Sequence, residues 1–342
     1  MEEPKADPPR PSHSPRHRSL TRRRFWQLGA ATAVAAADAG SLWQAGAASA
    51  AAQDYFDKAA ELAGNDPVLT SLVDALSSGY APPHPTAPAP QKIFDNVAVL
   101  SAGWVSATAI LTSSGIILID ALTNPTEARR YIVSGLCTLG ADPATIKYVV
   151  VTHGHGDHFG GAQYLADQYG ARVMMAPADW NALAASRPPN APTRDLNITD
   201  GQSLALGDTT VKLHYTPGHT AGSVSPIFPA RWQGGAHTAM LWGGTAPPTA
   251  TASKETYLNS ILTFASKMSQ AGVDVELSNH AFCDYGLERM TELRADPGIS
   301  DNPFVLGTAK TKVFMQVMEN MLRGRIALDQ ESTATTQAAG CC

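Results

Sequence analysis

The chain has 342 residues, with 25 Lys and Arg against 30 Asp and Glu, so its formal net charge is -5 at pH 7. Residues 51–342 alone carry 18 basic and 26 acidic side chains. This excess of negative charge disfavours polyanions, so nucleic acid is not an expected partner and a small molecule is the expected substrate. Without the first fifty residues the chain has roughly 290 residues, a length that suits one large α/β domain.

The first fifty residues resemble an export leader. The run Thr21-Arg22-Arg23-Arg24-Phe25-Trp26-Gln27 resembles a twin-arginine signal, in which paired arginines precede a large apolar residue. A modest apolar stretch follows, too weak for a stable membrane span, and Ala48-Ser49-Ala50 offers a small-residue cleavage site. We therefore predict that residues 1–50 are a leader outside the fold and that the protein is periplasmic or secreted. A disordered basic tail is the alternative.

Residues 51–91 are predicted to form N-terminal helices and a Pro-rich linker. Helical spacing between Gln53 and Ser78 is broken at Gly64-Asn65-Asp66-Pro67, and Tyr80 to Pro90 is rich in proline. These helices could cover the mouth of a site or pack on the outside of the molecule. The main domain is predicted to span residues 92–325, followed by a flexible tail at residues 326–342.

Two apolar strands are predicted to end in polar residues. Residues 116–119 lead into Asp120, and Lys147 to Val151 lead into Thr152-His153-Gly154-His155-Gly156-Asp157-His158. On an extended backbone His153 and His155 face the same side, while Asp157 and His158 follow where the chain turns. Neutral imidazoles and carboxylates at this density are typical ligands of a dication. One segment can therefore supply ligands to two metal ions. A solvated His-rich loop is the alternative interpretation.

This motif resembles the signature of the metallo-β-lactamase superfamily, H-x-H-x-D-H after a strand. It is followed by a predicted helix at residues 162–169, and the order of the other elements extends the resemblance over roughly residues 92–320. The resemblance implies an α/β fold of the αββα type, with two mixed β-sheets face to face and helices outside. It places the site at one end of the sheets and implies two Zn²⁺ ions per chain.

The same resemblance supplies a third ligand of the first metal. Tyr215-Thr216-Pro217-Gly218-His219 follows the predicted strand at residues 210–214 and looks like the family's second motif. His219 would then join His153 and His155. His214 is the competing histidine, but it lies within the strand and is expected to be structural.

The second metal is completed by the family's final motif. Residues 273–279 form a predicted strand that ends at His280, so Asp157, His158 and His280 would form the second site. The family also keeps an aspartate at the place of Asp120, where it hydrogen-bonds backbone and ligands around the metals.

One departure from the family pattern selects among its branches. Many members carry a carboxylate that bridges both metals, but Ala239-Met240-Leu241-Trp242-Gly243-Gly244-Thr245-Ala246-Pro247 contains none. This argues against the glyoxalase II, lactonase and ribonuclease Z-like branches. Neither Cys137 nor Cys283 falls where the first β-lactamase subclass has its cysteine; they could be free thiols or a disulfide. The ligand set most resembles the third, dizinc subclass.

The expected mechanism follows from the metals. A dication lowers the pKa of bound water toward ~7, and the resulting hydroxide would attack a carbonyl carbon. Asp157 is the candidate catalytic residue because it can orient the nucleophile. Ser223, Tyr215 and Asn279 are candidate oxyanion donors.

Three functions remain open from the sequence. The first is hydrolysis of a β-lactam-type cyclic amide, and the second is hydrolysis of a lactone, thioester or ester on the same fold. The third is a metal-binding protein without hydrolase activity.

Overall fold

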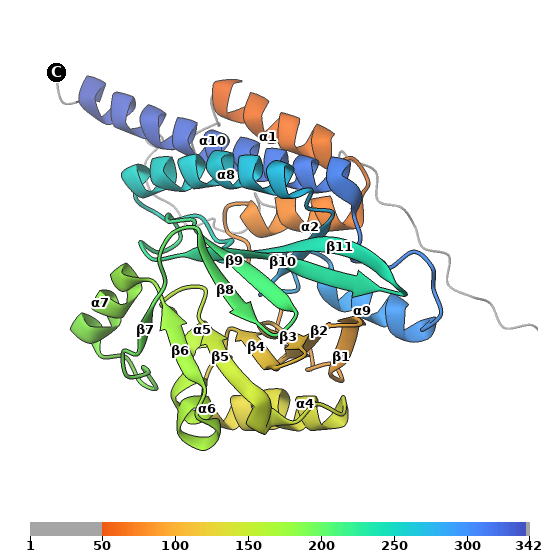
Figure 1. Cartoon of the computed structure of the whole chain (residues 1–342). Coiled ribbons are helices and arrows are strands. Elements are labelled where there is room, and N and C mark those ends of the chain that lie inside the picture. The colour runs from red at the N-terminus through yellow and green to blue at the C-terminus, as the bar shows by residue number, and fades with distance from the viewer. Residues whose placement is uncertain (1–49, 340–342) are drawn as a thin grey trace, which may run out of the picture. The chain divides into compact units, whose positions relative to one another are not determined.

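The structure, a computed structural model, describes residues 50–339 and the side chains of residues 51–332. The predicted leader up to Ser49 and the terminal Cys341-Cys342 lie outside the described residues. The helices (Figure 1) are α1 (Ala50–Ala63), α2 (Pro67–Leu76), α3 (Pro125–Glu127), η1 (Ala128–Val133), α4 (Ser134–Thr138), η2 (Pro143–Thr145), α5 (Gly156–Phe159), α6 (Ala162–Tyr169), α7 (Pro177–Ser186), α8 (Thr251–Ala271), α9 (Gly286–Ala295) and α10 (Gly307–Ala339).

The strands form two mixed sheets. The larger sheet has the order β1-β2-β3-β4-β5-β6-β7 and the smaller one β12-β11-β10-β9-β8. The strands from β4 to β7 are parallel, as are β11 and β12, and the other neighbours are antiparallel. Their bounds are β1 (Gln91–Phe94), β2 (Val97–Ser101), β3 (Ser106–Thr112), β4 (Gly115–Ile119), β5 (Ile146–Val150), β6 (Arg172–Met175), β7 (Leu196–Asn197), β8 (Gln202–Leu206), β9 (Thr209–Tyr215), β10 (Val224–Trp232), β11 (Gly235–Trp242) and β12 (Val275–Ser278).

Alternating side chains of the strands fill separate cores on the two faces of each sheet. In β4, Ile117 and Ile119 point into the core between the sheets, whereas Ile116 and Leu118 pack on the opposite face. Strand β4 is therefore an uninterrupted apolar run, as expected for a strand that is buried on both faces. In β11 the alternation separates Leu241, between the sheets, from Trp242, under the helices.

Helices cover the outer face of each sheet (Figure 1). Apolar side chains of η1, α4 and α6 pack against the larger sheet, and those of α1, α2, α8 and α10 pack against the smaller one. The layers are thus helix, sheet, sheet, helix, and the predicted αββα fold is confirmed.

The N-terminal helices belong to this outer layer. Asp66 caps α2 by accepting hydrogen bonds from the backbone N–H groups of Val68 and Leu69, and Pro67 occupies the first turn, where it needs no hydrogen-bond partner. The buried side chain of Leu72 lies in the same core cluster as residues of α8 and α10. Of the two placements that the sequence left open, the structure supports packing on the outside.

Helix α10 is longer than its sequence pattern suggests. A flexible tail from residue 326 is predicted, whereas the helix in the structure continues to Ala339. The physical reason lies in packing, because Ile326 is buried in the cluster formed with α1 and α2, and Arg325 donates to the carbonyl of Leu76. Such contacts stabilise a helix more than its own propensity does. Within the described part of the chain, no helix has both the length and the apolar character needed to cross a bilayer.

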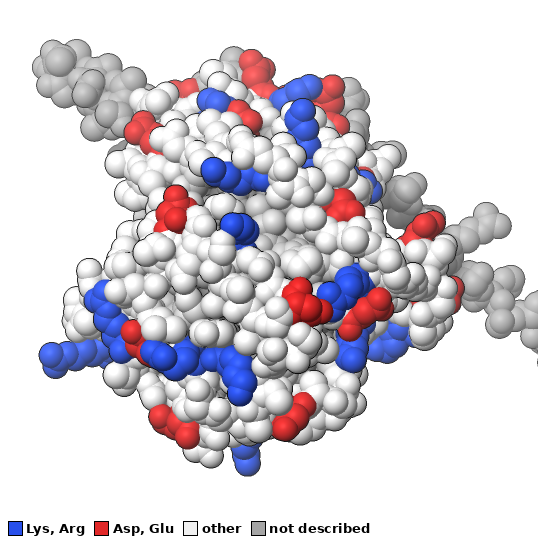
Figure 2. Space-filling view, viewed as in Figure 1, with Lys and Arg blue, Asp and Glu red and all other residues white. Residues whose placement is uncertain are grey.

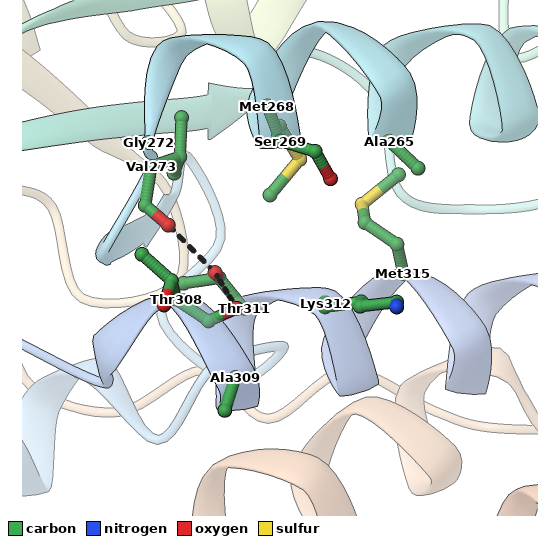
Figure 3. Close-up of a pocket in the computed structure, with 10 residues that line it drawn as sticks. All are labelled: Ala265, Met268, Ser269, Gly272, Val273, Thr308, Ala309, Thr311, Lys312 and Met315. Carbon is green, nitrogen blue, oxygen red and sulfur yellow. Dashed lines mark hydrogen bonds between the residues drawn. The ribbon is translucent and has the colours of Figure 1, made fainter.

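A groove of about 310 Å³ runs between α8 and α10 (Figure 3). Met268 and Met315 lie between the two helices, and Thr311 closes one end by donating to the carbonyl of Val273. The groove contains none of the predicted metal ligands.

The face of the molecule shown in Figure 2 is of mixed charge. On the face shown in Figure 2, basic and acidic side chains are interspersed and most of the surface belongs to neither kind. Cys137 is exposed and Cys283 is buried, and both are free thiols, which answers the question that the sequence left open about them.

Candidate metal centre

The polar residues singled out by the sequence follow strands that end at one edge of both sheets. Asp120 comes directly after β4, the histidine motif after β5, and His280 just after β12, while His219 lies in the turn between β9 and β10. Backbone hydrogen bonds join these loops across the sandwich, since Val224 donates to the carbonyl of Thr152 over 2.8 Å. Two loops of one sheet and two of the other thereby meet at one place.

Three histidines form the first cluster. Nε2 of His219 lies 3.1 Å from Nε2 of His153 and 3.0 Å from Nδ1 of His155. His153 is buried, His219 is half-buried and His155 is exposed, so the cluster has a buried floor and opens to solvent. These are the three residues predicted for the first metal.

The second cluster contains the three residues predicted for the second metal. Oδ2 of Asp157 lies 3.2 Å from Nε2 of His158 and 3.4 Å from Nε2 of His280. In each cluster the candidate ligand atoms all lie within 4.8 Å of one another. Convergence of this kind is what a single dication requires of its ligands.

The hydrogen bonds behind the histidines leave the correct nitrogen free. The Nδ1 atoms of His153, His219 and His280 face the carbonyl oxygens of Gly243, Ala246 and Trp104 respectively. Nδ1–H therefore donates to a carbonyl, and the lone pair of Nε2 points into the cluster. This arrangement behind a ligating imidazole is typical of metal sites.

The pKa values favour the neutral, ligating form of these rings. Burial, with nearby histidines, holds the pKa of His153 well below 6.5 and lowers that of His219 to about 4. Burial also lowers the pKa of His280 to about 4. At neutral pH these imidazoles are therefore uncharged.

His158 differs from the other histidines because it lies between two carboxylates. Burial alone would lower its pKa, but Asp120 and Asp157 outweigh burial and raise it to about 10. Its Nε2 is buried and makes no hydrogen bond, although Oδ2 of Asp157 is 3.2 Å away. An orphaned buried nitrogen beside an ionised carboxylate fits a cation at this point, which could balance the carboxylates in place of the proton.

Asp120 holds the second cluster from behind. Its Oδ2 accepts from Nδ1 of His158 over 2.8 Å and from the side chains of Thr152 and Asn279. Its Oδ1 accepts from the backbone N–H of Thr152 over 2.7 Å. The backbone of Asp120 has a φ of 62°, a left-handed conformation that Asp tolerates better than most residues.

Comparison with known proteins finds a family match over part of the chain. Residues 102–231 match the family model described as the metallo-beta-lactamase superfamily, a range that includes every predicted ligand except His280. The chain contains a metallo-β-lactamase superfamily domain. The resemblance inferred from the histidine motif is thereby confirmed.

Relatives of this superfamily domain are similar to the chain over part of their length. A hydroxyacylglutathione hydrolase from Acidiphilium cryptum (strain JF-5) is 39% identical over 109 residues, which are 32% of this chain and 40% of that protein. One from Anaeromyxobacter dehalogenans (strain 2CP-C) is 33% identical over 100 residues, 29% of this chain and 34% of that protein. The chain thus spans well under half the length of these curated relatives.

Solved metallo-β-lactamases share the fold over most of their length. The enzyme FEZ-1 from Legionella gormanii has a TM-score of 0.61 and 23% identity, covering 75% of this chain and 99% of that one. BJP-1 of Bradyrhizobium japonicum, a subclass B3 metallo-β-lactamase, has a TM-score of 0.56 and 23% identity, covering 75% and 98%. At this identity the likeness shows the fold alone.

The missing bridging carboxylate of the metallo-β-lactamase domain has a steric explanation. Gly243 and Gly244 stand where many members have the aspartate. A Cβ on Gly243 would lie 1.9 Å from the carbonyl oxygen of Val224, and one on Gly244 would lie 2.7 Å from the ring of His219. The backbone here packs directly against the first cluster, so a side chain at either position has no room.

Asp179 was not found from the sequence. Its carboxylate accepts from the backbone N–H groups of Gly154 (2.6 Å) and Gly222 (2.9 Å) and from the hydroxyl of Thr220 (2.7 Å). It therefore ties the loop of His153 and His155 to the loop of His219. In the sequence it looks like an ordinary acidic residue in the first turn of α7, and only the fold brings it between the loops.

The candidate oxyanion donors are engaged in other bonds. The hydroxyl of Tyr215 donates to the carbonyl of Ile198, and Nδ2 of Asn279 donates to Asp120. The hydroxyl of Ser223 is buried and shared with Thr220. The prediction that these three groups serve a developing oxyanion is therefore not supported, since each already serves the loops that carry the clusters.

Proposed function

We propose that the chain is a zinc-dependent hydrolase that opens a β-lactam-type cyclic amide. The observation that carries this proposal is the pair of adjacent ligand clusters with two glycines, and no carboxylate, at the bridge position. The first cluster would hold one zinc through His153, His155 and His219. The second would hold another through Asp157, His158 and His280.

Bound zinc in such a site supplies a water of lowered pKa and polarises a carbonyl oxygen. The residues of the chain provide the positions for this chemistry. Burial opposes ionisation of Asp157, but His158 and His280 outweigh burial and hold the pKa of its carboxyl far below 3.8. Asp157 is therefore a carboxylate at all working pH values, and it can accept a hydrogen bond from the attacking water and so orient it.

A second candidate, thioester hydrolysis, is favoured by the local sequence similarity to hydroxyacylglutathione hydrolases. The glycine pair argues in the other direction, since the resemblance ties the bridging carboxylate to that branch. The two functions differ in the substrate and use the same ligand residues, so one experiment separates them.

The test combines metal content with turnover. We would count zinc per chain and assay a chromogenic cephalosporin and a carbapenem beside thioester, lactone and ester substrates. Two zincs with β-lactam turnover, lost in His280→Ala, would support the first proposal. Two zincs with turnover of thioesters alone would replace it by the second. Two zincs without any turnover would favour the metal-binding alternative, and fewer than two would contradict the ligand assignment.

Export by a twin-arginine route is part of the same proposal, because a folded, zinc-loaded enzyme suits that route. Its support is the run from Arg22 to Phe25. Changing Arg23 and Arg24 to Lys should retain the protein inside the cell, as measured by fractionation and immunoblotting. Unchanged export would refute the prediction.

A further inference from the structure

A row of aromatic rings lies beside the second cluster. The ring centroids are 5.7 Å apart for Tyr80 and Phe282, 5.2 Å for Phe282 and His280, and 5.5 Å for His280 and Trp104. The ring of His84 follows at 5.2 Å from Trp104. The row thus passes through one of the candidate ligands, His280, and extends from it in both directions.

The rings come from three separate parts of the chain. Trp104 lies in the turn between β2 and β3, Phe282 follows β12, and Tyr80 and His84 belong to the segment between α2 and β1. Tyr80, Trp104 and Phe282 are each half-buried, so each keeps part of its surface in solvent. Half-exposed aromatic side chains that gather beside a candidate catalytic site are what an apolar ligand group binds.

The N-terminal segment is held in place over this region. Gly103 has a φ of 105°, and a Cβ on it would lie 2.2 Å from the carbonyl oxygen of Pro85, so the Pro-rich backbone rests directly on the turn that carries Trp104. Beyond it, Arg294 donates to the carbonyl of Ala89 over 3.1 Å. A proline-rich segment fixed in this way is semi-rigid and can present Tyr80 in one position.

We propose that Tyr80, Trp104 and Phe282 form a binding wall for an aromatic group that flanks the scissile carbonyl of the substrate. The proposal rests on the proposed hydrolase function and names the substrate class of that same site. The segment preceding the superfamily domain thereby becomes part of the substrate site, and a planar ring is preferred to an alkyl group of equal size. The competing explanation is that the rings serve only to hold the N-terminal segment down.

The side chain of Trp104 can be changed without loss of the bond that orients His280. The acceptor for Nδ1 of His280 is the main-chain carbonyl of Trp104, which Trp104→Leu retains. Tyr80→Leu removes a ring on the opposite side of His280 from Trp104. Trp232→Leu is the matched control, because Trp232 is also half-buried but lies at the end of β10 remote from Val224 and the site.

The experiment compares pairs of β-lactams and thioesters that carry a phenyl or a cyclohexyl side chain, with the full chain at full zinc content. We expect kcat/KM to favour phenyl by about 3- to 10-fold, a range typical of one or two ring contacts. Trp104→Leu and Tyr80→Leu should remove this preference through KM, with kcat nearly unchanged, and Trp232→Leu should keep it. Equal rates for both side chains, or a preference that survives in the two wall variants, would refute the wall.

Binding of inert probes separates this proposal from the proposed function. Phenylacetamide and cyclohexylacetamide would be titrated calorimetrically into the zinc-loaded chain and its variants. Tighter binding of the phenyl probe, lost in Trp104→Leu, would support the wall even with no substrate hydrolysed. Equal binding of both probes would refute the wall while leaving hydrolysis standing.

Discussion

At the residue scale, Asp120 concentrates more of the site's hydrogen bonding than any ligand does. It is fully buried, yet it accepts from a ligand ring, a hydroxyl, an amide and a backbone N–H. Buried carboxylates are stable only when their oxygens are satisfied in this way. The geometry fixes which nitrogen of His158 faces the second cluster, so Asp120 would act on a metal there through that ring.

We therefore expect Asp120→Asn to lower zinc affinity at the second cluster by about 10- to 100-fold, while the first cluster keeps its metal. Isothermal titration of zinc would show one site weakened and the other unchanged. Asp274→Asn is the matched control, because Asp274 also holds a histidine Nδ1, that of His237 at 2.7 Å, and a backbone N–H. It lies before β12, away from the clusters. Equal losses at both sites would contradict the orienting role.

At the element scale, the loop after β11 shows why a bridging carboxylate cannot simply be added to this site by one substitution. Gly243 gives its carbonyl to His153, and Gly244 faces the ring of His219. A bridging aspartate at either position would require this loop to lie farther from the first cluster. The close approach of the backbone to the first cluster is possible only because both residues are glycines.

Gly244→Asp is therefore expected to push His219 aside and to lower zinc occupancy at the first cluster, although it adds a carboxylate. Zinc per chain after gel filtration measures this. Gly298→Asp is the control, since Gly298 is exposed and a Cβ there meets only Asp296 at 3.6 Å. A gain in zinc affinity would show that the loop can move and that the steric argument is wrong.

The same scale shows what the sequence could predict. Six candidate ligands were named because a short motif and the order of strands along the chain carry the information, and the structure brings them together. Asp179 and the ring of Trp104 were missed because their roles depend on which loops meet, and no local pattern encodes that. The continuation of helix α10 past residue 325 was missed for the same reason: Ile326 packs with side chains of α1 and α2, which lie about 250 positions earlier in the chain.

At the scale of the whole molecule, α1 and α2 are part of one core and not an appendage. Leu72 is fully buried among side chains of α8 and α10. We expect Leu72→Ala to lower the free energy of unfolding by about 2–5 kcal/mol, in a single transition seen alike by fluorescence and circular dichroism. Leu262→Ala, at an exposed position, should change it by less than about 0.5 kcal/mol. A separate early transition would show that the helices unfold on their own.

The division of the candidate ligands between the two sheets determines when, during folding, a metal can bind. Within each cluster, residues of the β5 loop meet a histidine from the other sheet, His219 in one case and His280 in the other. Neither cluster can form until the sheets have docked, so under the proposed function zinc would bind after the two sheets have packed together. We expect zinc to slow unfolding in stopped-flow measurements while leaving the rate of refolding unchanged. Faster refolding in zinc would mean that zinc already binds to a partly folded chain. If zinc binds only after the sheets have docked, the supply of metal sets the lifetime of the folded chain, whereas packing of the apolar sheets alone sets the rate of folding.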